Sequence, residues 1–137
     1  MEPYLHKVQY YETDKMGIAH HSNHIKWMEE ARVDFFEKIG YNYSQLEEQG
    51  IISPVIGIQC DYKTSTRFED LLEITLKVKE FKGVKLIFSY VMKKSKTGEM
   101  IAEAESTHCF VNHEGKPIIL KKEFPELDTA LKELVFQ

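Results

Sequence analysis

One long and strongly apolar helical segment constrains the fold of this chain more than any other feature. The segment follows a histidine-rich loop and is expected to run to Ile39, with Gly40 as its C-terminal stop. Ser22 and Asn23 are both candidate N-caps. A helix on a protein surface needs only a narrow apolar stripe, so this helix is expected to be covered on more than one side. Its apolar residues fall in one broad arc at about 100° per residue: Ile25, Met28, Ala31, Phe35, Phe36 and Ile39.

The second half of the chain changes from a helical period to a period of two. Strict alternation of apolar and polar residues begins after Ser53. Alternation of this kind is typical of half-buried strands in mostly antiparallel sheets. Pairs that end in glycine predict turns within this region, at Lys82-Gly83, Thr97-Gly98 and Glu114-Gly115. The alternating rows are Ile56–Tyr62, Leu72–Val78, Val84–Met92 and Met100–Phe110.

Shorter elements complete the chain. A first strand is expected over Tyr4–Tyr11, where aromatic and β-branched residues alternate with polar ones. A short helical turn is expected over Ser44–Glu48, with Ser44 as its cap. Apolar residues spaced as in an amphipathic helix follow Pro125. No linker or repeat interrupts the chain, so residues 1–137 are expected to form a single domain.

These elements indicate an α+β fold in which a curved antiparallel sheet wraps around the long central helix. Ala102, Ala104 and Ser106 lie on one face of the last strand, and their small side chains would let a thick helix approach closely. A single sheet of this kind leaves an edge strand and part of the helix uncovered. We therefore expect a homodimer, because pairing two subunits edge to edge would cover both.

Composition narrows the classes of function. The chain is 42% hydrophobic and 29% charged, which is ordinary for a globular protein, and its net charge of −4 gives no argument for a nucleic-acid partner. No apolar run approaches membrane-spanning length, and the N-terminus lacks the pattern of a signal peptide. Cys60 and Cys109 are expected to be reduced strand residues. These features favour a cytoplasmic protein without membrane insertion.

An aspartate stands shortly before the long helix. Asp14 is a candidate nucleophile or general base, because unpaired amides at a helix start can stabilise an oxyanion nearby. Gly17 would allow close approach of the backbone. The alternative is that Asp14 only satisfies backbone amides of its own turn, which is common for aspartate.

Three histidines form the second candidate group. His20 and His24 would share a face if the helix began early, and together with Asp14 they could bind zinc. The sequence lacks the H-E-x-x-H pattern, so hydrogen-bonding or stacking roles for His20, His21 and His24 are favoured, and no metal is predicted.

Glu29 is the third candidate. Glu29 and Arg32 are three residues apart at the margin of the apolar arc, and we expect them to form an ion pair. A role for Glu29 in assisting the site or orienting its helix is the alternative. Other hydrolase classes are disfavoured, since the chain has no G-x-S-x-G nucleophile elbow and neither cysteine lies at a helix start.

These motifs together resemble a known family. The run Tyr11-x-Thr13-Asp14-x-Met16-Gly17, then His21-x-Asn23 and Glu29-x-Ala31-Arg32, is similar to the hotdog-fold acyl-CoA thioesterases of the 4-hydroxybenzoyl-CoA thioesterase and YbgC type. The resemblance covers nearly the whole chain. It implies a dimer, often paired into a dimer of dimers, with active sites at the dimer interface. It also implies hydrolysis of an acyl-CoA thioester without a cofactor, with acyl carrier protein as a second source of the acyl group.

The resemblance also implies roles for individual residues. The carboxylate of Asp14 would attack the thioester carbonyl or activate water, and the backbone amide of His21 would bind the carbonyl oxygen. His20 and His24 depart from the family, in which tyrosine at the first position and an aromatic residue at the second are common. A non-catalytic acyl-CoA-binding or acyl-carrier-protein-binding domain of the same fold stays an alternative. The expected substrate-binding positions are Tyr11, Gly17, His20, Asn23, His24 and Glu29.

Overall fold

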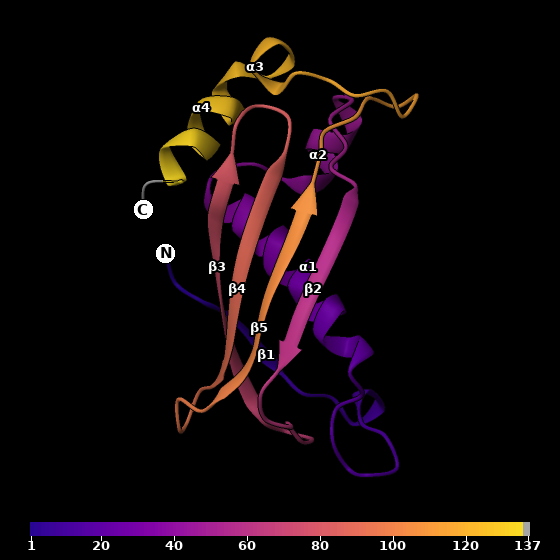
Figure 1. The fold of residues 1–137 in the computed structure, drawn as a ribbon, viewed down its shortest axis with the longest axis vertical. Coiled ribbons are helices and arrows are strands. Elements are labelled where there is room, and N and C mark those ends of the chain that lie inside the picture. Colours follow the sequence, from indigo (N-terminus) through magenta and orange to yellow (C-terminus); the bar gives the residue numbers. More distant parts are fainter. Residues whose placement is uncertain (136–137) are drawn as a thin grey trace. The chain divides into compact units, whose positions relative to one another are not determined.

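Five strands form one sheet in the order β1-β3-β4-β5-β2, in a computed structural model that describes residues 1–135 (Figure 1). β1 pairs antiparallel with β3, and Tyr4 lies opposite Ile74 in that pair. The strand order places β1 and β2 at the two edges of the sheet. The strands are β1 Tyr4–Lys7, β2 Val55–Tyr62, β3 Leu71–Phe81, β4 Leu86–Lys94 and β5 Met100–His108.

The helices agree with the predicted pattern at most positions. The long helix is confirmed as α1, and the C-terminal amphipathic helix as α4. The predicted cap at Ser44 is wrong, because the Asn42 side chain accepts hydrogen bonds from the amides of Ser44 and Gln45. None of the helices among residues 1–135 is both long and apolar enough to cross a membrane. The helices are η1 Tyr10–Glu12, α1 Ser22–Lys38, α2 Tyr43–Glu48, α3 Leu120–Glu123 and α4 Pro125–Leu134.

The first strand is shorter than the alternation predicted. β1 ends at Lys7, and the chain then turns into the 3₁₀ helix η1. The reason is a hydrogen bond of 2.8 Å from the Gln9 amide to the Glu12 carboxylate, which draws the backbone into a turn. Local alternation in the sequence could not reveal this bond.

Gly40 ends α1 as predicted. Its φ of +96° lies in the left-handed region, which glycine adopts without a steric penalty. The Tyr41 amide donates to the Phe36 carbonyl, and the Gly40 amide donates to the Glu37 carbonyl. This pair of bonds is the Schellman motif, and it satisfies carbonyls that the end of the helix would otherwise leave without partners.

Contacts between residues group the chain into two compact units. The first unit comprises residues 1–34, 60–76 and 90–104. Its core contains the first three turns of α1, where Trp27, Met28 and Ala31 are buried. Arg32 is also buried, and its Nη1 donates a hydrogen bond of 3.1 Å to the Tyr90 hydroxyl.

The second unit comprises residues 35–59, 77–89 and, among the described residues, 105–135. Its core is aromatic: Phe35 and Phe36, from the last turns of α1, contact the Phe88 ring edge to face. Leu127 and Leu131 of α4 are fully buried. The 3.6-residue spacing of the apolar residues therefore places them in the core, as expected for an amphipathic helix.

The alternating rows also formed strands, with three differences. The fourth row was expected to reach Phe110, but β5 ends at His108. The predicted turns at Gly83, Gly98 and Gly115 are present, and each glycine has positive φ. Val84 lies in the first of these turns rather than in β4. The apolar row of β2 is not half-buried: Ile56 is 59% exposed and other apolar residues of this edge strand are also exposed.

Candidate functional site

Asp14 begins a tight turn in the loop that precedes α1. The Gly17 amide donates to the Asp14 carbonyl at 2.9 Å, and the Asp14 amide donates to the Ile18 carbonyl at 2.9 Å. Gly17 has a φ of +78°, which this turn requires and which most other residues adopt only with strain. An isolated bridge between Thr13 and Ala19 closes the base of the loop. The sequence therefore folds locally into a small hairpin with the aspartate at the start of its turn.

The two carboxylate oxygens of Asp14 differ in their surroundings. Oδ1 accepts a hydrogen bond of 2.8 Å from the Met16 amide, which is the kind of local contact that the alternative for Asp14 described. Within residues 1–135, Oδ2 has no hydrogen-bond partner. One oxygen is thus held in place while the other is available to a ligand.

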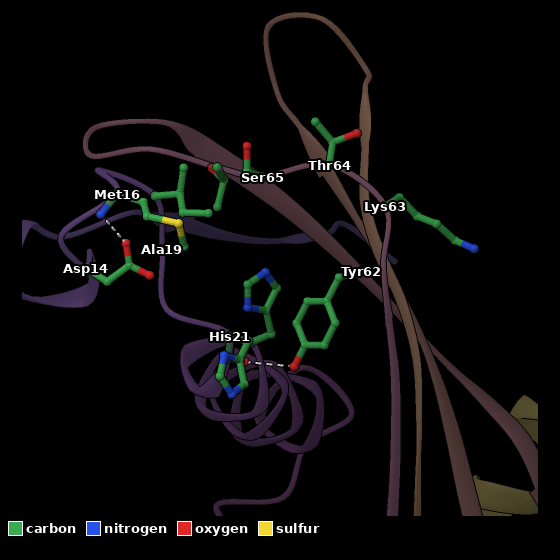
Figure 2. A pocket seen from close by; sticks show the side chains of 11 residues that line it. Asp14, Met16, Ala19, His21, Tyr62, Lys63, Thr64 and Ser65 are labelled. Atoms are coloured by element: carbon green, nitrogen blue, oxygen red, sulfur yellow. Dashed lines mark hydrogen bonds between the residues drawn. The ribbon is translucent and has the colours of Figure 1, made fainter.

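Asp14 lies on the wall of a pocket of about 280 Å³ within the first unit (Figure 2). One wall comes from the loop and the start of α1, and the other from the end of β2 and the segment after it. Figure 2 shows Asp14 and Tyr62 on opposite sides, with the Lys63 side chain directed away from Asp14. The residues that line the pocket are Asp14, Met16, Ile18, Ala19, His21, His24, Tyr62, Lys63, Thr64, Ser65 and Thr66.

Tyr62 fixes the position of the chain at the start of α1. Its hydroxyl donates a hydrogen bond of 2.8 Å to the backbone carbonyl of His21 (Figure 2). Burial raises the pKa of Tyr62 to about 12, and the neighbouring Cys60 adds to the shift, so the hydroxyl stays protonated as a donor. The backbone amide of His21 has no hydrogen-bond partner in the described part of the chain. A residue that lines the pocket therefore carries a backbone donor that no group in this part of the chain uses.

His24 is a buried polar group in the same pocket. It is 4% exposed, and its ring packs edge to face on Tyr62 and at a tilt on Trp27. Burial lowers the pKa of His24 to about 4, so the imidazole is neutral at pH 7. The nearby His21 carbonyl favours the protonated ring and so opposes this lowering of the pKa. It does not meet the geometry of a hydrogen bond to Nδ1, so this buried nitrogen has no partner among the described residues.

The loop is tied to α1 through Glu12, a residue that the sequence patterns did not identify. The backbone carbonyl of Glu12 accepts hydrogen bonds of 2.8 Å from the His20 amide and from Nδ2 of Asn23. Asn23 is buried and its side chain also donates to the His20 carbonyl. These bonds hold the chain on either side of His21 in place. Asn23 thus acts as a donor to the loop, and not as the N-cap acceptor predicted as one alternative.

The side chain of Glu12 is the centre of a buried hydrogen-bond network. Its Oε1 accepts bonds from the Gln9 amide at 2.8 Å and from Nε2 of His6 at 2.9 Å, and its Oε2 accepts from Nε1 of Trp27 at 2.7 Å. Burial alone would raise the pKa of Glu12, but these bonds outweigh it and lower the pKa. His6 also contacts Glu30 at 3.1 Å. No local pattern signals this network, because the partners are scattered in the sequence.

The other predicted site residues do not line the pocket. Tyr11 is 82% exposed, and Gly17 and Glu29 are also exposed. His20 is exposed, and its Nδ1 lies 2.8 Å from the Ser22 hydroxyl. The predicted ion pair of Glu29 with Arg32 is wrong, because Arg32 is buried and donates to a tyrosine hydroxyl instead. Sequence spacing placed these two residues near each other, but α1 directs one to the core and the other to solvent.

The structure does not assemble the zinc ligands considered above. Across residues 1–135, no three His, Cys, Asp or Glu side chains converge to a geometry that could hold a metal ion. His20 and His24 differ sharply in burial, and only His24 shares the pocket with Asp14. The arrangement present is a carboxylate, a free backbone amide and a neutral imidazole around one cavity.

Comparisons with known proteins identify the family. The sequence profile of the thioesterase-like superfamily matches residues 8–134. The chain is 34% identical over 128 residues to the "putative acyl-CoA thioesterase YneP" of Bacillus subtilis, and the match covers 93% of this chain and 92% of that protein. It is 29% identical over 133 residues to the acyl-CoA thioesterase YbgC of Helicobacter pylori, with 91% and 98% of the two chains covered.

Solved structures agree with the sequence relatives. The crystal structure of a DHNA-CoA thioesterase from Staphylococcus aureus superposes with a TM-score of 0.92 at 30% identity, covering 96% of this chain and 89% of that one. The predicted α+β hotdog fold, with its curved antiparallel sheet and long helix, is therefore confirmed. The predicted enzyme class, thioester hydrolase, is that of the family. The chain belongs to the thioesterase-like superfamily and has its hotdog fold.

Proposed function

We propose that the protein is an acyl-CoA thioesterase, which converts an acyl-CoA and water to a carboxylic acid and free CoA. The single observation that supports this most directly is the pocket in which Asp14 and the free backbone amide of His21 occur together. The names of the sequence relatives point to the same substrate class. Acyl carrier protein is a second acyl donor, because it presents the same phosphopantetheine arm as CoA.

The chemistry follows from the charges in the pocket. The His21 amide donates a hydrogen bond to the thioester oxygen as negative charge develops there. Asp14 either attacks the thioester carbon itself or takes a proton from the water that attacks it. In the first route CoA leaves as its thiolate, which takes a proton from solvent, and water then hydrolyses the acyl-aspartyl anhydride at the acyl carbon. In both routes the C–S bond breaks and the acid takes one oxygen from water.

Two hydrogen bonds prepare this chemistry. The bond from the Met16 amide fixes one oxygen of Asp14, which restricts the rotation of the carboxylate and leaves Oδ2 for the reaction. The bond from the Tyr62 hydroxyl to the His21 carbonyl ties the start of α1 to the opposite wall, which the end of β2 forms. The nucleophile or base and the oxyanion donor are thus both held before substrate arrives.

The substitution Asp14→Asn tests the role of the carboxylate. Asparagine can still accept the hydrogen bond from the Met16 amide, so the turn should persist while the negative charge is lost. We expect kcat to fall by on the order of a hundredfold or more, with KM roughly preserved. Asp61→Asn, at an exposed β2 residue outside the pocket lining, is the matched control and should leave kcat unchanged.

The assay is release of free CoA from a panel of acyl-CoAs that differ in chain length and aromatic character. Folded Asp14→Asn protein that keeps near wild-type turnover on its best substrate would refute the role of Asp14. Wild-type protein that binds acyl-CoA without hydrolysing any member of the panel would favour the acyl-binding-domain alternative instead.

We also propose that the protein assembles as a homodimer that pairs further into a dimer of dimers. β2 is an edge strand of the sheet, so one row of its backbone hydrogen-bonding groups lacks a neighbouring strand. Val55, Ile56 and Ile58 on this strand are 44%, 59% and 38% exposed, which is a large apolar surface for one strand. Contact with a second copy along β2 would bury these side chains.

A further inference from the structure

Asn23 is a buried polar residue that does not line the pocket, although its place in the sequence suggested contact with substrate. It is 7% exposed. Its Nδ2 donates hydrogen bonds of 2.8 Å to the Glu12 carbonyl and of 3.2 Å to the His20 carbonyl. A carbonyl oxygen cannot donate, so the atom that faces both of them is the amide nitrogen of this side chain and not its oxygen. Asn23 therefore uses both of its side-chain donors to hold the backbone.

The bond to the His20 carbonyl controls the direction of the amide that follows it. The C=O of His20 and the N–H of His21 belong to one planar peptide unit, and in a trans peptide they point in opposite directions. Two donors of Asn23 hold this carbonyl, Nδ2 at 3.2 Å and the backbone amide at 3.0 Å. Fixing the C=O therefore fixes the N–H, which cannot turn without breaking both bonds.

The bond to the Glu12 carbonyl ties this peptide unit to a rigid part of the loop. The Glu12 side chain is buried and accepts three hydrogen bonds, so the backbone of this residue has little freedom to move. Its carbonyl also accepts from the His20 amide at 2.8 Å. Glu12 stands two residues before Asp14. One asparagine side chain thus links the segment that carries the carboxylate to the peptide that carries the His21 amide.

We propose that Asn23 is a positioning residue for thioester hydrolysis, which does not touch the substrate but orients the peptide whose N–H stabilises the oxyanion. The proposal rests on the proposed thioesterase function, in which the His21 amide binds the thioester oxygen. Removing an oxyanion donor outright costs about 10²- to 10³-fold in kcat, and a misdirected donor loses part of that effect. Loss of the Asn23 side chain should therefore lower kcat by about 10-fold or more.

The variants Asn23→Ala and Asn23→Ser differ by one hydroxyl group. A serine hydroxyl in a helix can donate to a carbonyl three residues earlier, which here is that of His20. It has a single proton to donate, so it cannot hold the Glu12 carbonyl as well. Both carbonyls keep a backbone donor in either variant, so both proteins should fold. We expect kcat to fall by about 10-fold or more in Asn23→Ala and by less in Asn23→Ser.

The affinity for a ligand without a carbonyl oxygen separates positioning from general damage to the pocket. The probe is the thioether of the acyl-CoA that wild-type protein hydrolyses fastest, with CH₂ in place of the C=O group. It cannot accept a bond from the His21 amide, so its Kd in calorimetry should be the same for wild type and both variants, and KM should be roughly preserved. Asn42→Ala is the control, because it removes a helix cap in the second unit and lowers stability but should leave kcat unchanged.

The possible outcomes separate this proposal from the proposed function. Asn23→Ala protein with wild-type kcat would overturn the role of Asn23 and leave the thioesterase function intact. Equal losses of kcat in Asn23→Ala and Asn23→Ser would also overturn it, and so would a Kd for the thioether that weakens as much as kcat falls. Should Asn23→Ala fail to fold, Asn23→Thr and Asn23→Val repeat the comparison, and equal rates for these two would contradict the proposal. Wild-type protein that hydrolyses no acyl-CoA would refute the proposed function itself.

Discussion

Replacing Glu12 by glutamine should destabilise the protein by far more than an ordinary surface substitution. The carboxylate accepts three hydrogen bonds, from the Gln9 amide, from His6 and from Trp27, and the residue is 4% exposed. A glutamine side chain has a single oxygen. Its best orientation keeps that oxygen on Gln9 and His6, which turns the NH₂ group toward the indole N–H of Trp27.

The magnitude follows from counting these groups. One buried donor is left without an acceptor, at a cost of about 1–3 kcal/mol. The remaining bonds lose the negative charge that strengthened them, which adds about 1 kcal/mol. We therefore expect Glu12→Gln to lower the free energy of unfolding by about 2–4 kcal/mol at pH 7. The exposed control Glu114→Gln should change it by less than about 0.5 kcal/mol.

The same network predicts how the difference varies with pH. The pKa of Glu12 in the folded protein is below its ordinary value of 4.5, so the folded state favours the ionised form. This contribution to stability is complete above the unfolded-state pKa and is lost as the pH falls through the lower, folded-state pKa. The gap between wild type and Glu12→Gln should therefore be constant near neutrality and narrow below about pH 4.

Urea unfolding followed by tryptophan fluorescence measures these values, at one fixed protein concentration because association affects apparent stability. Trp27→Phe and the double variant complete a thermodynamic cycle. Glu12→Gln should cost less in the Trp27→Phe background, since the unpaired indole N–H is then absent, and circular dichroism replaces fluorescence for those two proteins. A change below 0.5 kcal/mol for Glu12→Gln at pH 7 would show that the reasoning about its hydrogen bonds is wrong.

Further predictions concern the metal, the assembly and the end of α1. Thioesterase activity should survive exhaustive chelation, whereas activity that disappears and returns with zinc would favour the histidine-cluster hypothesis. Sedimentation at micromolar concentration should show a dimer or tetramer, and a stable folded monomer would contradict the proposed pairing. Gly40→Ala should lower the free energy of unfolding by about 1 kcal/mol, because its φ of +96° is strained for alanine. The added methyl group itself meets no atom within 4 Å, so steric contact does not add to this cost. Gly40→Asn should cost less in the same urea assay, since asparagine tolerates this conformation better.

The sequence by itself determined the features that depend on local pattern. The apolar arc predicted α1, and Gly40 predicted where it ends, because helical period and left-handed backbone preference are properties of a few adjacent residues. Alternation predicted the strands for the same reason. The motif around Asp14 also lies within one short stretch, which is why the family could be identified from it.

The tertiary structure decided which side chains meet. Glu12 lies in an unremarkable sequence position, and only folding brings it to Trp27, fifteen residues away, through a hydrogen bond of 2.7 Å. Spacing predicted that Arg32 would pair with Glu29, yet burial directs Arg32 to the hydroxyl of Tyr90, fifty-eight residues away. Burial and choice of partner depend on residues distant in sequence, and a local pattern carries no information about them.

The same distinction applies to the pocket. The sequence placed Asp14, His21 and His24 in one short stretch together with Asn23, and did not show which of them line the pocket. Asn23 does not line it, because its side chain bonds to the loop instead. The opposite wall comes from the end of β2, forty residues further along the chain, and only the pairing of distant segments brings it there. That packing also leaves Nδ1 of the buried His24 without a partner in the described part of the chain. The hydrogen bonds of a buried ring depend on every atom around it, and not only on the residues next to it in sequence.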